Sequence, residues 1–159
     1  MSQPDARFLL NHPAHFIALG FGSGLAPKAP GTFGTLVAIP LYWASQFASL
    51  PAQLLLVVSA FLLGIWACGL TGQHLGVHDS GHIVWDEIAA FLLVLVFTPA
   101  GALWMLYAFA LFRLFDIWKP FPINWLDATV KGGLGVMLDD ALAAVYALGM
   151  LFLARYALA

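Results

Sequence analysis

Two adjacent acids, Asp86 and Glu87, stand at the head of an apolar run that continues to Phe97 without another charge. A second adjacent pair, Asp139 and Asp140, heads another apolar run near the C-terminus. On insertion scales an acid at the centre of a bilayer costs about 3 kcal/mol, and neighbouring acids also repel each other. Such groups face protein or water and by default suggest a functional site.

The elements that must position these acids are predicted helices over 81–97 and 100–117, joined as an antiparallel hairpin by a turn at Thr98 and Pro99. Pairing positions across this turn places Asp86 level with Arg113. The last predicted helix brings in its acids at about the same depth. One shallow layer is therefore expected to hold an arginine and five carboxylates, which are Asp86, Glu87, Asp116, Asp139 and Asp140.

Five carboxylates beside one arginine would not stay ionised unaided, because like charges and desolvation both disfavour the charged form. A bound divalent cation removes both problems, and Mg²⁺ prefers oxygen ligands. The sequence therefore predicts a Mg²⁺ site. The competing interpretation is narrower: Arg113 and Asp116 are three residues apart and can form a simple ion pair on one helix.

The histidines give a weaker pattern. His78, His82 and Asp86 are spaced four apart, which on a helix would suit a zinc site. However, Gly81 interrupts that face, and Asp79 or Ser80 is better interpreted as the N-cap of the helix that follows.

A glycine-rich segment, GFGSGLAPKAPGTFG, is predicted on the same face as the acids. Its backbone N–H groups could bind a phosphate, or the segment could be a hinge before the first helix. It matches neither the P-loop nor the dinucleotide fingerprint. The residues predicted to bind substrate are Gly22, Ser23, Gly24, Thr32, Lys119 and Lys131.

The composition sets the class of protein. Of 159 residues, 62% are hydrophobic and 9% are charged, with mean hydropathy +0.92. A soluble domain carries about 25% charged residues, so the chain is predicted to be an integral membrane protein with a single domain over 1–159. The net charge of −2 and the lack of a basic tract give no sign of a nucleic-acid partner, and the oligomeric state is left open.

The predicted fold is an all-α polytopic bundle with about five spanning helices and a short N-terminal interfacial or re-entrant segment. The helices are expected over 35–50, 52–72, 81–97, 100–117 and 136–157. With short connections, Arg7, Lys28, Lys119 and Lys131 share one face and Arg155 lies opposite, so the face with the acids is predicted to be cytoplasmic.

A cation, surplus carboxylates and lysines at a membrane surface suit a phosphorylated lipid headgroup, with water as the favoured nucleophile. Spacing alone does not separate a hydrolase from a transferase. A divalent-cation transporter is the alternative from another class, although transporters usually bind ions near the midplane and carry repeats. A non-catalytic protein that binds anionic lipids is a third candidate.

Four stretches, GFGSGLAPKAPGTFGT, DSGHIVWDE, FRLFDIWKPFPINWLD and GGLGVMLDDALAA, resemble the bacterial phosphatidylglycerophosphatase A family. They occur in the family's order over roughly residues 20–145. The resemblance implies a Mg²⁺-dependent enzyme of the bacterial inner membrane, with its active site on the cytoplasmic side. It would hydrolyse phosphatidylglycerophosphate to phosphatidylglycerol and inorganic phosphate.

Carried over position by position, the resemblance assigns acidic and basic site residues. The acids are Asp79, Asp86, Glu87, Asp116, Asp139 and Asp140, and the basic residues are Arg113 and Lys119. Thr35 stands where a serine is usual and Ala90 where a glycine is usual, both small changes. Lys28 does not belong to the pattern.

Overall fold

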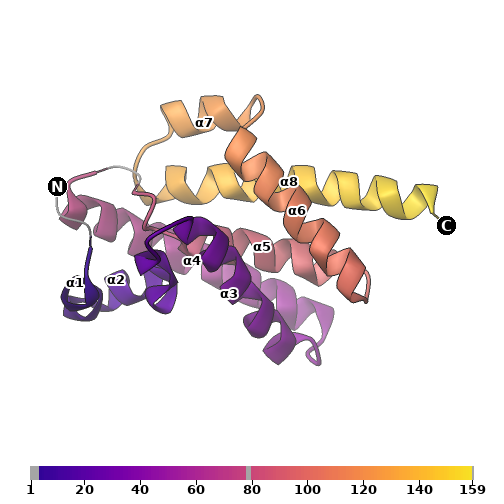
Figure 1. Ribbon diagram of the computed structural model, residues 1–159, viewed down its shortest axis with the longest axis horizontal. Helices are drawn as coiled ribbons and strands as arrows, with labels where there is room; N and C mark the ends of the chain where they lie inside the picture. Colours follow the sequence, from indigo (N-terminus) through magenta and orange to yellow (C-terminus); the bar gives the residue numbers. More distant parts are fainter. Residues whose placement is uncertain (1–3, 78–79, 159) are drawn as a thin grey trace.

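The computed structural model describes residues 4–77 and 80–158, and this part of the chain is helical with no strand (Figure 1). Four short or medium segments come first: α1 (Ala6–Asn11), α2 (Pro13–Ala18), the 3₁₀ segment η1 (Gly20–Leu25) and α3 (Pro30–Ser45). They are followed by α4 (Leu50–Leu75), α5 (Trp85–Phe97), α6 (Ala102–Trp118), α7 (Ile123–Thr129) and α8 (Gly132–Ala157). The all-helical prediction is confirmed for these residues.

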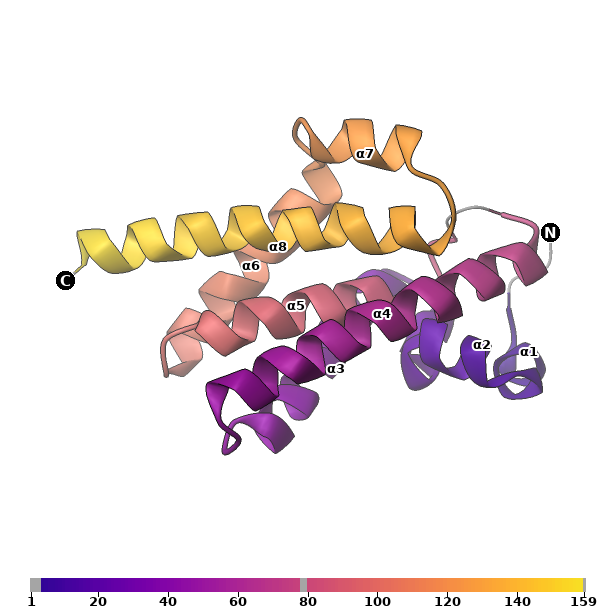
Figure 2. The ribbon, with the colours of Figure 1, turned by 180° about the vertical axis from the view of Figure 1, so that it is seen from behind.

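Helix α5 is the centre of the bundle. Ten of its 13 residues are buried, and it packs against α3, α4, α6 and α8. Figure 2 shows α5 between α4 and α8, the two longest helices. The acidic pair at the head of α5 is therefore covered from several sides.

Among the residues that the structure describes, two helices, α4 and α8, are long and apolar enough to cross a membrane. Large apolar side chains such as Phe47, Leu55 and Leu103 are exposed, as expected where acyl chains replace water. With 13 residues, α5 is about 20 Å long at about 1.5 Å per residue, against a hydrocarbon core of about 30 Å. The apolar helices indicate membrane association.

Several predicted helix starts differ from the observed ones. Helix α3 begins at Pro30 rather than 35, because proline suits the first turn of a helix, where its missing N–H leaves no bond unmade. For the same reason α4 begins at Leu50, with Pro51 inside its first turn. Helix α8 begins at Gly132, four residues before the predicted start.

The start of α5 was predicted at 81 but lies at Trp85. The residues before it are bonded to the N-terminal part of the chain instead of forming a helical turn. His82 Nδ1 lies 2.7 Å from the Gly24 carbonyl oxygen, and the Val84 N–H donates to the Ala18 carbonyl at 2.9 Å. The predicted N-terminal segment is thus a set of short helices that packs on the acidic end of the bundle.

Helices α4 and α8 pack closely because glycines, which have no side chain, lie where they touch. A Cβ added to Gly133 would lie 1.8 Å from the Ile65 carbonyl oxygen and 2.8 Å from the Gly69 nitrogen. The two backbones therefore touch at the beginning of α8. Helix α7, which was not predicted, packs on the outside of α8 (Figures 1 and 2).

Candidate functional site

The first turn of α5 and the third turn of α8 bring three carboxylates together. One carboxylate oxygen each from Asp86, Glu87 and Asp140 lies within 4.8 Å of the others. All three residues are at most 9% exposed. We call these three side chains the acid cluster.

Each residue of the acid cluster has a carboxylate oxygen that accepts no hydrogen bond from the described residues. Within the described residues, Asp86 Oδ1, Glu87 Oε2 and Asp140 Oδ2 are buried and have no hydrogen-bond partner. A buried carboxylate oxygen without a partner is costly. Oxygen-only ligands at this spacing are the donor set of a hard divalent cation such as Mg²⁺, so the residues fit the predicted metal.

Arg113 borders the acid cluster from α6. Its Nη1 atom lies 3.6 Å from Glu87 Oε1 and makes a short contact with Asp116 Oδ2, three residues along the same helix. Its buried Nε atom has no acceptor among the described residues. Asp116 therefore forms the simple ion pair with Arg113 that its spacing allows. The same ion pair also lies beside the acid cluster, through the contact of Arg113 with Glu87.

Asp139 faces a different partner from its neighbour Asp140. The Lys119 Nζ atom lies 2.6 Å from Asp139 Oδ2 and 3.1 Å from Asp127 Oδ2, the latter on α7. Neither Asp139 nor Asp116 belongs to the group of three within 4.8 Å. Their roles as metal ligands remain predictions. Asp79, another predicted ligand, lies outside the described residues.

These two carboxylates also set the charge of Lys119. Burial alone would lower the pKa of its ammonium group, but the hydrogen bonds and attraction of Asp139 and Asp127 outweigh burial. The net effect is that the pKa of Lys119 is raised above its ordinary value. The charged form of this lysine, at the end of α6, is therefore favoured by its two carboxylate partners.

The glycine-rich segment forms a closed turn. The N–H groups of Gly22 and Gly24 both donate to the Leu19 carbonyl at 3.0 Å, and Ser23 Oγ donates to the Gly20 carbonyl at 2.8 Å. In this conformation the amides of Gly22 and Gly24 are used inside the turn, which does not favour the predicted phosphate nest. The segment instead anchors His82 through the Gly24 carbonyl.

Two other residues that were predicted to bind substrate, Thr32 and Lys131, lie outside the acid cluster. The Thr32 N–H donates to the Ala29 carbonyl in the first turn of α3, and the exposed Lys131 donates to the Asp127 carbonyl at 3.3 Å. Sequence reasoning did not identify Gly31 and Thr35 as site residues, although both touch Arg113 or Glu87. The density of glycine in GTFGT is the only signal that pointed to a close approach there.

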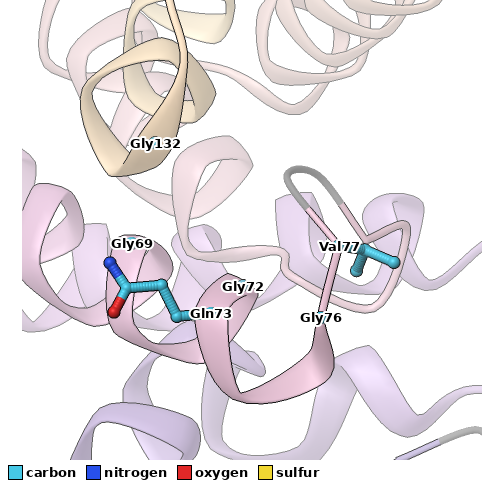
Figure 3. Close-up of a pocket in the computed structure, with 6 residues that line it drawn as sticks. All are labelled: Gly69, Gly72, Gln73, Gly76, Val77 and Gly132. Carbon is cyan, nitrogen blue, oxygen red and sulfur yellow. The ribbon is translucent and has the colours of Figure 1, made fainter.

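A separate cavity of about 280 Å³ lies between the end of α4 and the beginning of α8. Figure 3 shows its lining, with Gln73 and Val77 beside the backbones of Gly69, Gly72, Gly76 and Gly132. None of the acid cluster lines it. The chemistry of the site is therefore concentrated between α5, α6 and α8.

Comparison with known proteins gives consistent results. A family model described as phosphatidylglycerophosphatase A matches residues 16–155. A phosphatidylglycerophosphatase A from Escherichia coli is 43% identical over 150 residues, covering 92% of this chain and 86% of that protein. One from Haemophilus influenzae is 44% identical over 158 residues, covering 98% and 96%.

A third relative has a different name. A protein from Bacteroides thetaiotaomicron, provisionally named a phosphatidylinositol-3-phosphatase, is 40% identical over 149 residues, covering 88% of this chain and 92% of that protein. No solved structure matches the chain. All three names describe enzymes that act on a phosphorylated lipid.

Proposed function

Since the chain belongs to the phosphatidylglycerophosphatase A family, we propose that it hydrolyses phosphatidylglycerophosphate to phosphatidylglycerol and inorganic phosphate. The chain is thus a phosphatase, a phosphoric monoester hydrolase. The observation that carries the proposal within the structure is the acid cluster, whose buried oxygens lack donors beside an arginine.

Asp86, Glu87 and Asp140 would hold Mg²⁺, with Asp116 and Asp139 as further candidates from the family pattern. When bound, Mg²⁺ supplies a Lewis acid that polarises a phosphoryl oxygen and makes a bound water more acidic. The acids of the cluster are buried and close together, as ligands of one cation must be. Asp116 would be a further ligand or the group that orients the attacking water.

Arg113 and Lys119 would meet the negative charge of the phosphate. The Arg113 side chain is 16% exposed, so its guanidinium group would be a charged donor for a phosphoryl oxygen. Lys119 is already paired with Asp139 and Asp127. Its charge would act on the phosphate from that fixed position, as a neutraliser of charge in the transition state.

The substrate would reach this site from the membrane. We infer a multi-pass protein of the bacterial inner membrane in which α3, α4, α5, α6 and α8 cross or enter the bilayer. The lysines at the acidic end support a cytoplasmic active site by the positive-inside rule. The short length of α5 is compatible with acids that lie near the membrane surface instead of at its centre.

The test is phosphate release by the protein purified in detergent. Phosphatidylglycerophosphate is supplied with Mg²⁺ or with EDTA, and inorganic phosphate is measured. We expect release with Mg²⁺ and none with EDTA. Phosphatidylinositol 3-phosphate is the comparison substrate because of the third relative's name. An absence of release from phosphatidylglycerophosphate would contradict the proposal, and uptake of Mg²⁺ into vesicles would favour the transporter instead.

A further inference from the structure

Arg113 is held from three helices, and one of its three acceptors is neutral. Its Nη1 atom contacts the carboxylates of Glu87 on α5 and Asp116 on α6. The third acceptor is Oγ1 of Thr35 on α3, at 3.5 Å. Both carboxylates would also be attracted to a bound cation, whereas the hydroxyl is a neutral group on a separate helix.

The Thr35 hydroxyl has a fixed orientation. The residue is fully buried, and its hydroxyl donates to the Gly31 carbonyl one turn earlier at 2.9 Å. A hydroxyl has a single proton, so its remaining lone pair is what faces Arg113. Thr35 therefore presents an acceptor to the guanidinium and does not compete with it as a donor.

Gly31 provides the space for this arrangement. A Cβ on Gly31 would lie 2.1 Å from Glu87 Oε1 and 3.2 Å from Arg113 Nη1. The same turn of α3 therefore supplies the carbonyl that orients Thr35 and leaves room for the Glu87 carboxylate. This part of α3 is the wall of the site opposite α8.

We propose that Thr35 is a positioning residue for Arg113. Its hydroxyl fixes the orientation of the guanidinium group of Arg113, whose side chain is 16% exposed and whose charge would meet a phosphoryl oxygen of the substrate. This inference rests on the proposed phosphatase function. It adds α3 to the elements that determine how tightly the phosphate is bound.

The test compares Thr35→Val, which removes the hydroxyl at similar size, with Thr35→Ser, which keeps it. Thr98→Val is the matched control, because Thr98 also donates to a carbonyl one turn earlier, that of Val94 at 2.8 Å, at the far end of α5. We expect Thr35→Val to raise KM for phosphatidylglycerophosphate about tenfold, since hydrogen bonds to charged groups are stronger than neutral ones. Thr35→Ser and Thr98→Val should stay within about twofold of the wild type.

A second readout does not need turnover. Inorganic phosphate should raise the melting temperature of the wild type, of Thr35→Ser and of Thr98→Val. It should raise that of Thr35→Val by less than half as much. If Thr35→Val melts early without phosphate, Thr35→Ala, which adds no new contact, carries the same expectation.

The link through Arg113 is tested by a double-mutant cycle. The Arg113→Lys background keeps the charge but loses the planar fork of the guanidinium group. In this background, Thr35→Val should cause little further loss of phosphate binding. The inference would be overturned if Thr35→Val weakened phosphate binding as much in the Arg113→Lys background as in the wild type. It would also be overturned if Thr35→Val bound phosphate like the wild type. If the wild type released no lipid phosphate, the proposed function would fail, while the phosphate-dependent melting would still decide the role of Thr35. A wild type that showed neither response would overturn both.

Discussion

Lys119 and Asp139 form an ion pair, with 2.6 Å between Nζ and Oδ2, that joins the end of α6 to the acidic turn of α8. Asp139 is 4% exposed, so the charge of its carboxylate depends on this partner. We therefore expect Lys119→Met to lower the melting temperature as well as the activity. Asp139→Asn combined with Lys119→Met should recover part of the melting temperature, because the double variant no longer buries that charge.

Lys131→Met is the control for this experiment. Lys131 is exposed, and the contact observed for its ammonium is with the Asp127 carbonyl. The melting temperature of the Lys131→Met variant should stay close to that of the wild type, because surface charges usually contribute little to stability. Equal effects of the two lysine substitutions on melting would contradict a structural role for the Lys119–Asp139 pair.

Neutralising one member of the acid cluster should separate activity from stability. We expect Asp86→Asn and Asp140→Asn each to reduce the rate of phosphate release at least about 100-fold, as expected for the loss of a metal ligand or its orientation. The melting temperature in EDTA should stay the same or rise, because one like charge is removed. Asp5→Asn, at the N-cap of α1, is the carboxylate control and should keep its activity. A near-normal rate in Asp140→Asn would exclude that residue as a required ligand.

Removal of the metal should destabilise the folded chain. A ligand at 100 times its dissociation constant stabilises a protein by about 2.7 kcal/mol, so the wild type should melt at a lower temperature in EDTA than in Mg²⁺. Asp140→Asn should show a much smaller difference between the two buffers. A wild-type melting curve that ignores Mg²⁺ would argue against a cation bound by the acid cluster.

The N-terminal part of the chain should respond to acid through His15. Its Nδ1 lies 2.8 Å from the Phe8 carbonyl oxygen, so this nitrogen carries the proton and Nε2 accepts from Nδ1 of His74, also at 2.8 Å. Burial lowers the pKa of His15 below its ordinary value of 6.5, and the nearby His74 and His12 lower it further, against the effect of the Phe8 carbonyl.

Because the folded state takes up this proton less readily, the unfolded chain binds more protons at low pH. The stability contribution of His15 is therefore present above about pH 6.5 and declines as the pH falls below it. We expect melting temperatures measured between pH 8 and pH 5.5 to decrease with acid, and His15→Asn to flatten that decrease. An identical slope for the wild type and His15→Asn would show that other groups cause the pH dependence.

The backbone contact between α4 and α8 predicts an asymmetry between two glycines of one helix. Gly133→Ala places a methyl group against the Ile65 carbonyl and should destabilise the chain by about 1–3 kcal/mol, the usual range for overpacking. A Cβ on Gly149 would meet nothing within 4 Å, so Gly149→Ala should be neutral or stabilising. Unfolding in denaturant measures both, and equal stabilities would contradict the close helix contact.

Much of this architecture is predictable from the sequence because the apolar runs are long and the acids few. The helices that carry Asp86, Arg113 and Asp140 were all expected, and the structure brings Asp86, Glu87 and Asp140 together at their ends. Helix ends were less predictable where distant residues decide them. The bond between His82 and Gly24 joins residues 58 apart and delays the start of α5.

The wall formed by α3 was missed for a similar reason. Thr35 and Arg113 are 78 residues apart, and the glycines near Thr35 indicate a close approach without indicating which residue approaches. The different partners of Asp139 and Asp140 were also hidden, because adjacent side chains on a helix point in directions about 100° apart. Sequence spacing placed both acids at one depth without showing that only Asp140 would join the acid cluster.

The positions of the three acids in the sequence determine when the acid cluster can first form during synthesis of the chain. Asp86 and Glu87 are synthesised 54 and 53 residues before Asp140, so α5 is complete before the synthesis of α8 begins. Until then the two acids lack the third carboxylate of the cluster. The chain therefore gains the complete acid cluster only with α8, so a product truncated before α8 is not expected to release phosphate from the lipid.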